Sequence, residues 1–103
     1  PAAQMLHQKQ TGGLGILLPY VGGEFFSELL TGIDQTAQEA GYFLLISTSH
    51  RNENHFREAL LGIRRRVDGL IIMATEMTAE DVARLIPIQV PVVFSNTEYE
   101  TNA

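Results

Sequence analysis

Short apolar runs alternate with longer amphipathic segments along the chain. Four runs are almost entirely apolar and show no regular alternation with polar residues; they lie at residues 14–18, 43–47, 70–74 and 90–94. Continuous runs of this length are typical of strands that are covered on both faces, as in a parallel sheet. The sequence therefore predicts four strands at these positions.

The segments between the runs predict three helices. The first has an apolar stripe that ends just before Gly41, a natural C-terminal stop, and consists of Phe26, Leu29, Leu30, Ile33, Ala37 and Ala40. Asn52 is the predicted N-cap of the second helix, whose stripe is Phe56, Ala59, Leu60 and Ile63. "TAED" at 78–81 predicts the start of a shorter helix that Pro87 ends. The predicted fold class is α/β, a parallel sheet with helices on both faces.

The two ends of the chain fit this unit less well. Residues 1–11 are polar and Ala-rich and have no obvious packing partner, and residues 95–103 follow a strand without a helix to cover it. We therefore expect a fragment of a longer protein, in which residues 1–11 are a linker remnant and residues 12–103 form the folded unit. One edge strand of the sheet is expected to have unpaired backbone N–H and C=O groups.

Composition and charge exclude several classes of function. The net charge of -5 argues against this stretch gripping a phosphate backbone by itself. The absence of cysteine excludes disulfides, thiolate nucleophiles and Cys-based zinc sites. No apolar run approaches the length of a membrane span, and no secretory signal opens the chain. A cytoplasmic location, with no membrane partner, is the default expectation.

Candidate chemistry gathers after the predicted strands, because the carboxyl ends of parallel strands meet at one edge where ligands bind. The loops there supply flat aromatic surfaces from Tyr20, Phe25 and Phe26, and hydrogen-bonding groups from Ser49, His50, Thr75, Glu76, Ser95 and Asn96. Rings beside neutral or acidic acceptors suit a polyhydroxylated ligand such as a sugar. The alternative, that Phe25 and Phe26 are both core residues, stays open at this stage.

Other motifs give weaker indications of a functional site. "TGGLG" at 11–15 precedes a strand and lacks a P-loop lysine, which makes a phosphate cradle unlikely and a flexible turn the better interpretation. His50 and His55 are five apart across a loop–helix junction and are better explained as surface residues than as metal ligands. The basic run 64–66 sits at a helix C-terminus, where solvated positive charge is favoured. No nucleophile–base arrangement stands out, so no catalytic residue, metal or cofactor is assigned.

Three segments together carry a family resemblance: "GILLPYVGGEFFSELLTGIDQTAQEAGYFLLISTSH", "RRRVDGLIIMATEMT" and "VPVVFSN". They resemble the effector-binding domain of LacI/GalR-type bacterial transcription regulators, which is related to periplasmic sugar-binding proteins. "EFFSELLTGI" and Val67-Asp68-Gly69 are the most specific parts. The resemblance implies the N-terminal lobe of a periplasmic-binding-protein-like (type I) fold. It also implies a non-enzymatic sensor in a homodimer that binds operator DNA.

The resemblance also interprets residues 1–11 as the remnant of a hinge helix. Ala3, Gln4 and Leu6 match the family's A-R-x-L pattern, with Gln4 in place of the usual arginine, and Thr11 follows at the expected distance. Leu6 would be the side chain that wedges into the minor groove. The helix-turn-helix and the second lobe are expected to lie outside this sequence.

For the ligand, the resemblance implies that Phe25 and Phe26 line the effector cleft. Glu76 matches a position that is acidic in some sugar-binding relatives. Departures from the family pattern leave the identity of the sugar open; they are Tyr20, Gly23, Glu24, and Asn96 with Thr97.

Two alternative functions remain open. A solute-binding protein of a transporter would share the sheet and the aromatics, although the missing export signal and the hinge-like start count against it. An enzyme on a flavodoxin-like or receiver-like sheet is weaker, because Tyr20 and Thr75 stand where a receiver needs acidic residues.

Overall fold

The elements follow the order that the sequence predicts. The computed structural model describes residues 11–20, 22–73, 77–87 and 89–95. This part of the chain contains β1 (Gly13–Leu18), α2 (Gly23–Glu39), β2 (Phe43–Thr48), α3 (Glu53–Ile63), β3 (Gly69–Ile72), α4 (Ala79–Leu85) and β4 (Val92–Phe94). The strands form a parallel sheet in the order β2-β1-β3-β4. The predicted α/β class and parallel sheet are confirmed.

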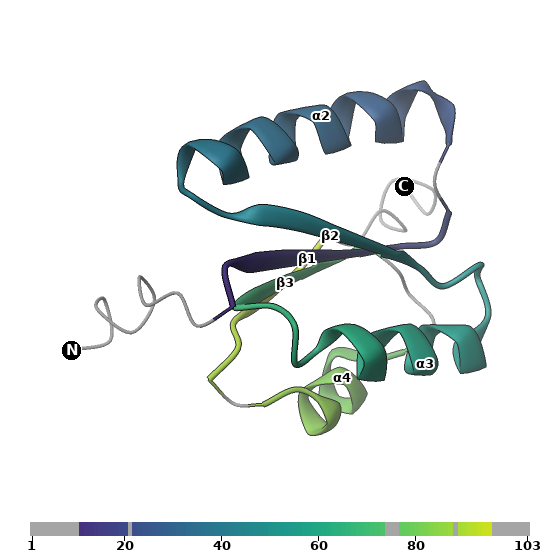
Figure 1. The fold of residues 1–103 in the computed structure, drawn as a ribbon. Coiled ribbons are helices and arrows are strands. Elements are labelled where there is room, and N and C mark those ends of the chain that lie inside the picture. The colour runs from purple at the N-terminus through teal and green to yellow at the C-terminus, as the bar shows by residue number, and fades with distance from the viewer. Residues whose placement is uncertain (1–10, 21, 74–76, 88, 96–103) are drawn as a thin grey trace.

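Helices cover both faces of the sheet. Helix α2 lies on one face, and α3 and α4 lie on the other (Figure 1). From β1 the chain moves to β2 on one side and later to β3 on the other, so crossovers of one hand place α2 and α3 on opposite faces. The order reverses between β1 and β3, which makes their carboxyl ends the topological switch point where ligands bind in such sheets.

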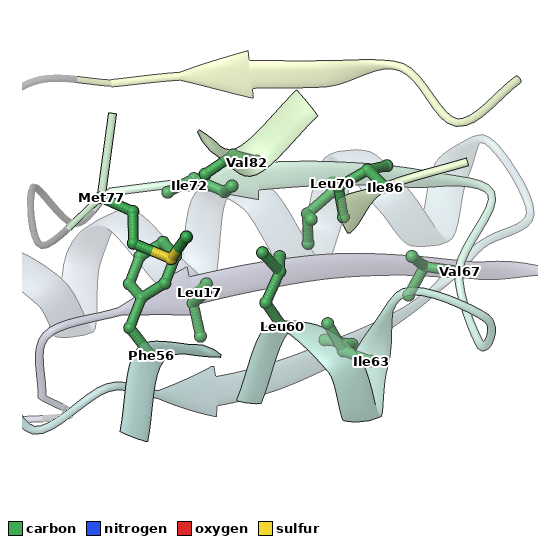
Figure 2. Packing of buried hydrophobic residues seen from close by; sticks show 10 residues of the cluster. All are labelled: Leu17, Phe56, Leu60, Ile63, Val67, Leu70, Ile72, Met77, Val82 and Ile86. Carbon is green, nitrogen blue, oxygen red and sulfur yellow. The ribbon is translucent and has the colours of Figure 1, made fainter. Parts of the chain in front are cut away.

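Side chains of the central strand β1 divide between two cores. Leu17 points into the larger core beneath α3 and α4 (Figure 2), which consists of Leu17, Phe56, Leu60, Ile63, Val67, Leu70, Ile72, Met77, Val82 and Ile86. Its neighbours Ile16 and Leu18 point to the other face, where Phe26 and Met73 complete a smaller core beneath α2. Because side chains alternate along a strand, one apolar run supplies both layers.

The edge strands are less buried than the sequence pattern predicts. Phe43 on β2 and Val93 on β4 are 51% and 60% exposed, whereas Ile16, Leu17 and Leu18 on β1 have no exposed surface. The expectation that each apolar run is covered on both faces is therefore wrong for β2 and β4. A local apolar run does not reveal whether its strand lies at the centre or at the edge of the sheet.

Helix α2 ends at the predicted glycine. Gly41 has φ of 85°, its N–H donates to the carbonyl of Gln38 at 2.9 Å, and the N–H of Tyr42 donates to the carbonyl of Ala37 at 2.8 Å. This pair of bonds defines a Schellman motif, which needs a residue in the left-handed conformation.

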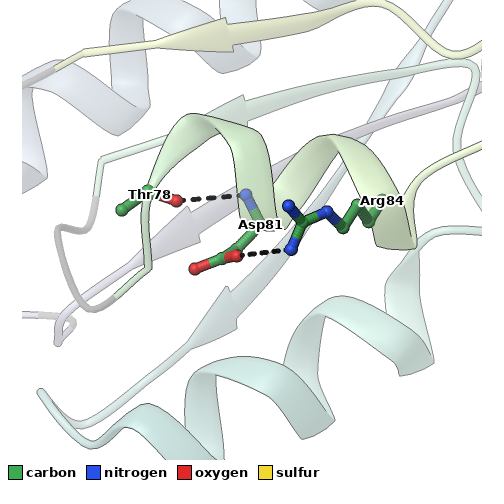
Figure 3. A network of polar contacts seen from close by, with 3 residues as sticks. All are labelled: Thr78, Asp81 and Arg84. Carbon is green, nitrogen blue, oxygen red and sulfur yellow. Dashed lines mark hydrogen bonds and ion pairs between the residues drawn. The ribbon is translucent and has the colours of Figure 1, made fainter.

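Helices α3 and α4 begin at their predicted caps. The side-chain oxygen of Asn52 accepts from the N–H of His55 at 3.0 Å, and Thr78 Oγ1 accepts from the N–H of Asp81 at 3.1 Å. Asp81 also pairs with Arg84 at 3.2 Å (Figure 3). Because this ion pair is exposed, it contributes less than about 1 kcal/mol, and burial of Val82 fixes α4 more strongly.

Arg64 departs from the prediction that residues 64–66 are solvated. Its Nη1 donates to the carbonyl of Leu85 at 2.6 Å, at the C-terminal end of α4, and its Nε is buried with no partner among the described residues. Arg65 and Arg66 are exposed as expected. The positive charge of Arg64 is favoured at the negative end of the α4 dipole, and it ties α3 to α4.

A carboxylate fixes the start of β1 at the amino edge of the sheet. Asp68 accepts hydrogen bonds from the N–H of Thr11 at 2.9 Å, from Thr11 Oγ1 at 2.9 Å and from the N–H of Gly12 at 3.1 Å. The Asp68 N–H in turn donates to the carbonyl of Gly13 at 2.7 Å. Asp68 thereby joins the segment before β1 to the start of β3, although the two are far apart in sequence.

We expect Gly62→Ala to raise the free energy of unfolding by about 0.5–1 kcal/mol. Gly62 lies in α3, and a Cβ added there would meet nothing within 4 Å. The methyl group therefore reduces backbone freedom in the unfolded chain at no steric cost. The thermal unfolding midpoint of the complete protein measures the effect.

The matched control is Gly41→Ala, which makes the same chemical change at a residue with positive φ. It should lower the midpoint, because an L side chain is strained there. If both variants shift the midpoint in the same direction, the assignment of these two backbone conformations is wrong.

Candidate functional site

The predicted ligand site lies at the carboxyl ends of the strands and is called the crevice below; its first residues connect β1 to α2. Gly22 and Gly23 have φ of 153° and 80°, a range that favours glycine, and a Cβ on either would meet nothing within 4 Å. This turn places Phe25 and Phe26 in the first turn of α2. Figure 1 shows that the start of α2 and the β2–α3 connection lie at the same end of the sheet.

The three predicted aromatic residues form one cluster. The Phe26 ring lies 5.2 Å from the Tyr20 ring and 5.2 Å from the Phe25 ring, with interplanar angles of 86° and 66°. Such edge-to-face contacts are favourable between aromatic rings. The structure therefore brings Tyr20, Phe25 and Phe26 together as a continuous apolar surface.

The two adjacent phenylalanines have different environments. Phe26 is 8% exposed and belongs to the core beneath α2, whereas Phe25 is 61% exposed and Tyr20 is 44% exposed. The alternative that both phenylalanines are core residues is therefore wrong for Phe25. Because the exposed Phe25 ring contacts the buried Phe26 ring, it offers a flat surface of restricted mobility to a ligand.

The β2–α3 loop has an uncommon backbone. His50 and Arg51 both have φ of 55°. Neither residue is glycine, and the left-handed conformation costs about 1–3 kcal/mol for each of them. Strain of this kind persists only when its surroundings hold it, and it is concentrated at functional sites.

Ser49 anchors this loop to the end of β1. Its N–H donates to the carbonyl of Leu18 at 2.8 Å, and its own carbonyl accepts from the N–H of Asn52 at 3.1 Å. The side chain has no exposed surface. Ser49 therefore positions the loop, and its contact with a ligand stays a prediction.

Sequence reasoning missed Arg51. The guanidinium carbon of Arg51 lies 5.1 Å from the centroid of the Tyr20 ring, so this side chain spans from the β2–α3 loop to the β1–α2 loop. On the other side of the loop, His50 Nε2 lies 3.2 Å from Thr48 Oγ1, and the His50 and His55 rings are 5.5 Å apart. Arg51 follows His50 directly, but no local pattern shows that it folds back over Tyr20.

Some predicted residues lie outside the described part of the chain. These are Thr75, Glu76 and Asn96 at the crevice, and Ala3, Gln4 and Leu6 in the hinge segment. Within the described ranges, no group of three or more His, Asp or Glu side chains is arranged to hold a metal ion. No helix in those ranges is long and apolar enough to cross a membrane.

A groove of about 740 Å³ lies away from the crevice, between α2 and the part of the sheet formed by β1, β3 and the start of β4. It is mostly apolar and is lined by Leu14, Glu28, Leu29, Gly32, Ile33, Thr36, Ala37, Ala40, Tyr42, Asp68, Gly69, Ile71 and Pro91. Parallel sheets are normally covered on both faces. The groove therefore marks sheet surface that α2 leaves open, with Glu28, Thr36, Tyr42 and Asp68 as the polar side chains along it.

Comparison with known proteins identifies the family. Residues 11–102 match the family described as periplasmic binding proteins and sugar binding domain of LacI family. The chain belongs to this family. Catabolite control protein A of Priestia megaterium is 33% identical over an alignment of 103 positions, which covers 97% of this chain and 30% of that protein. The Escherichia coli K12 ribose operon repressor is 32% identical over 75 residues, which are 72% of this chain and 23% of that protein.

A solved structure of a LacI-family relative has the same fold. The Cra transcriptional dual regulator from Pseudomonas putida, crystallised in complex with fructose 1-phosphate, matches with a TM-score of 0.73 and 25% identity. The match covers 82% of this chain and 32% of that one. This LacI-family chain thus spans less than a third of the length of the relatives named here.

Proposed function

We propose that the chain is the N-terminal lobe of the effector-binding domain of a DNA-binding transcription regulator, and that it senses a sugar in the crevice at the carboxyl edge of the sheet. The relatives support this proposal, because they include a catabolite control protein and the ribose operon repressor. The Cra regulator, which has the same fold, was crystallised with a phosphorylated sugar.

The observation that carries the proposal is the exposure of Phe25 and Tyr20 beside a buried Phe26. Rings left in water at the switch point of a parallel sheet gain free energy when a ligand covers them. The C–H face of a sugar covers a ring, and hydroxyls around its edge need hydrogen-bonding partners such as His50. Thr75, Glu76 and Asn96 are proposed as further partners from the neighbouring loops.

The proposed mechanism is a shift between two states of a homodimer. A second lobe closes on the effector, and closure biases the equilibrium between states that do or do not order the hinge segments on operator DNA. Ala3, Gln4 and Leu6 are the proposed hinge residues, with Leu6 entering the minor groove. The protein then acts in the cytoplasm without catalysing a reaction.

A solute-binding protein of a transporter is the second candidate, because the same family includes periplasmic binding proteins. The curated relatives named above are regulators of gene expression, which favours the regulator. The transporter alternative makes a different prediction, since such a protein would bind the sugar but no operator.

The test is a thermal shift assay on the complete protein against sugars, sugar phosphates, nucleobases and amino acids. A ligand that binds only the native state raises the unfolding midpoint by mass action; at 100 times Kd the gain is about 2.7 kcal/mol. We expect one or more sugars or sugar phosphates to raise the midpoint. Shifts only with nucleobases or amino acids would contradict the sugar assignment. No shift with any compound would contradict the assignment of the crevice as an effector site.

A further inference from the structure

We propose that Arg51 is the anion-binding residue of the crevice, so that the effector is a sugar carrying a negatively charged group, either a phosphate or a carboxylate. This inference rests on the proposed function, because it takes the crevice as the effector site. It goes further by naming the chemical class of the effector and a residue that selects it.

The position of Arg51 is the first argument. Its guanidinium group lies over the Tyr20 ring, 5.1 Å from the centroid, although the two residues belong to different loops. Tyr20 in turn contacts the buried Phe26 edge-to-face. A full positive charge is therefore held directly beside the aromatic surface that is proposed to receive the sugar.

Among the described residues, no carboxylate neutralises the charge of Arg51. In residues 11–20, 22–73, 77–87 and 89–95, the ion pair found joins Asp81 and Arg84, and no carboxylate lies within ion-pair distance of Arg51. Glu24 and Glu53 occupy the first turns of α2 and α3, but neither pairs with it. No hydrogen-bond acceptor in the described ranges binds the Arg51 guanidinium, which leaves its five N–H donors available to a ligand.

The geometry of an arginine suits the proposed ligand. Its planar fork of N–H groups matches the oxygens of a phosphate or carboxylate and can donate two parallel hydrogen bonds. Arg64 illustrates the contrast, because its Nη1 already donates to the carbonyl of Leu85 and its side chain serves to join two helices. Arg51 makes no comparable bond in the described part of the chain.

The backbone strain of the loop has a structural consequence for Arg51. The left-handed conformation at His50 and Arg51 turns the chain so that the Arg51 side chain reaches back over the end of β1. The loop thereby carries its positive charge towards the neighbouring strand.

The experiment compares Arg51→Gln with the wild type in the complete protein by isothermal titration calorimetry. The probes are fructose 1-phosphate, glucose 6-phosphate and gluconate, with uncharged fructose and glucose beside them. We expect the wild type to prefer an anionic probe, and Arg51→Gln to weaken that binding about 10- to 100-fold. A phosphate and a carboxylate are distinguished by which anionic probe binds.

Arg65→Gln is the matched control, because it removes the same charge from an exposed residue beyond the far end of α3. It should leave all affinities unchanged. A second measurement needs no variant: raising the salt concentration from about 50 mM to about 500 mM should weaken wild-type binding of the anionic probe and leave an uncharged sugar unaffected.

The outcomes separate this inference from the proposed function. If an uncharged sugar binds as tightly as its phosphorylated form, or if Arg51→Gln binds the anionic probe as tightly as the wild type, the inference is overturned while a sugar sensor remains. If the wild type binds none of the sugars, both fail.

Discussion

Phe26→Ala is expected to lower the free energy of unfolding by about 3 kcal/mol, whereas Phe25→Ala should lower it by less than about 1 kcal/mol. The two residues are neighbours in the sequence and lose the same atoms, but only Phe26 is buried in the core beneath α2. Removing its ring leaves a cavity against Ile16, Leu18 and Met73, and it also removes the support of Tyr20. Removing the Phe25 ring leaves no cavity, because that ring already faces solvent.

For the folded proteins, the loss of effector affinity should instead be larger in Phe25→Ala than in Phe26→Ala. A variant with Phe25→Ala that remains folded should bind its sugar about 10-fold more weakly, because it loses one stacking surface. Denaturation of both variants measures the first effect, and calorimetric titration of the folded Phe25→Ala protein measures the second. Equal stability losses, together with an unchanged affinity of Phe25→Ala, would contradict the division of roles.

Asp68→Asn is expected to destabilise the amino edge of the sheet by about 1–2 kcal/mol. The Asp68 carboxylate accepts three hydrogen bonds from Thr11 and Gly12. An amide retains one acceptor oxygen but presents N–H donors to a second backbone N–H, and it loses the charge that strengthens the bonds. The segment before β1 should then be held less firmly to β3.

Hydrogen exchange of the amides at residues 11–13 measures this effect locally in the complete protein. The matched control is Asp34→Asn, since Asp34 accepts a bond only from Gln38 on its own helix in the structure as described. We expect faster exchange at residues 11–13 in Asp68→Asn and no change there in Asp34→Asn. Unaltered exchange in both variants would contradict the role of Asp68 as the anchor of this segment.

Local sequence signals predict the elements because the decisive interactions are local. The stops and starts of the helices depend on Gly41, Asn52 and Thr78, each of which acts on backbone groups within a few residues of itself. The apolar stripe of α2 likewise indicates that Phe26 is buried. The order of the elements then leaves few topologies for a parallel sheet.

Interactions between distant segments could not be predicted in this way. Exposure of Phe43 follows from the edge position of β2, which depends on how the whole sheet is ordered. Arg64 joins two helices, and Arg51 reaches a ring on another loop. Both arginines resemble ordinary surface charges in the sequence, because their partners are more than 20 residues away.

A crystal structure of the complete protein with the sugar that it binds tests the central claim most directly. We predict density for the sugar ring against Phe25 and Tyr20, at the carboxyl ends of β1 and β2. Density for the effector at another position, such as the apolar groove between α2 and β3, would contradict the account.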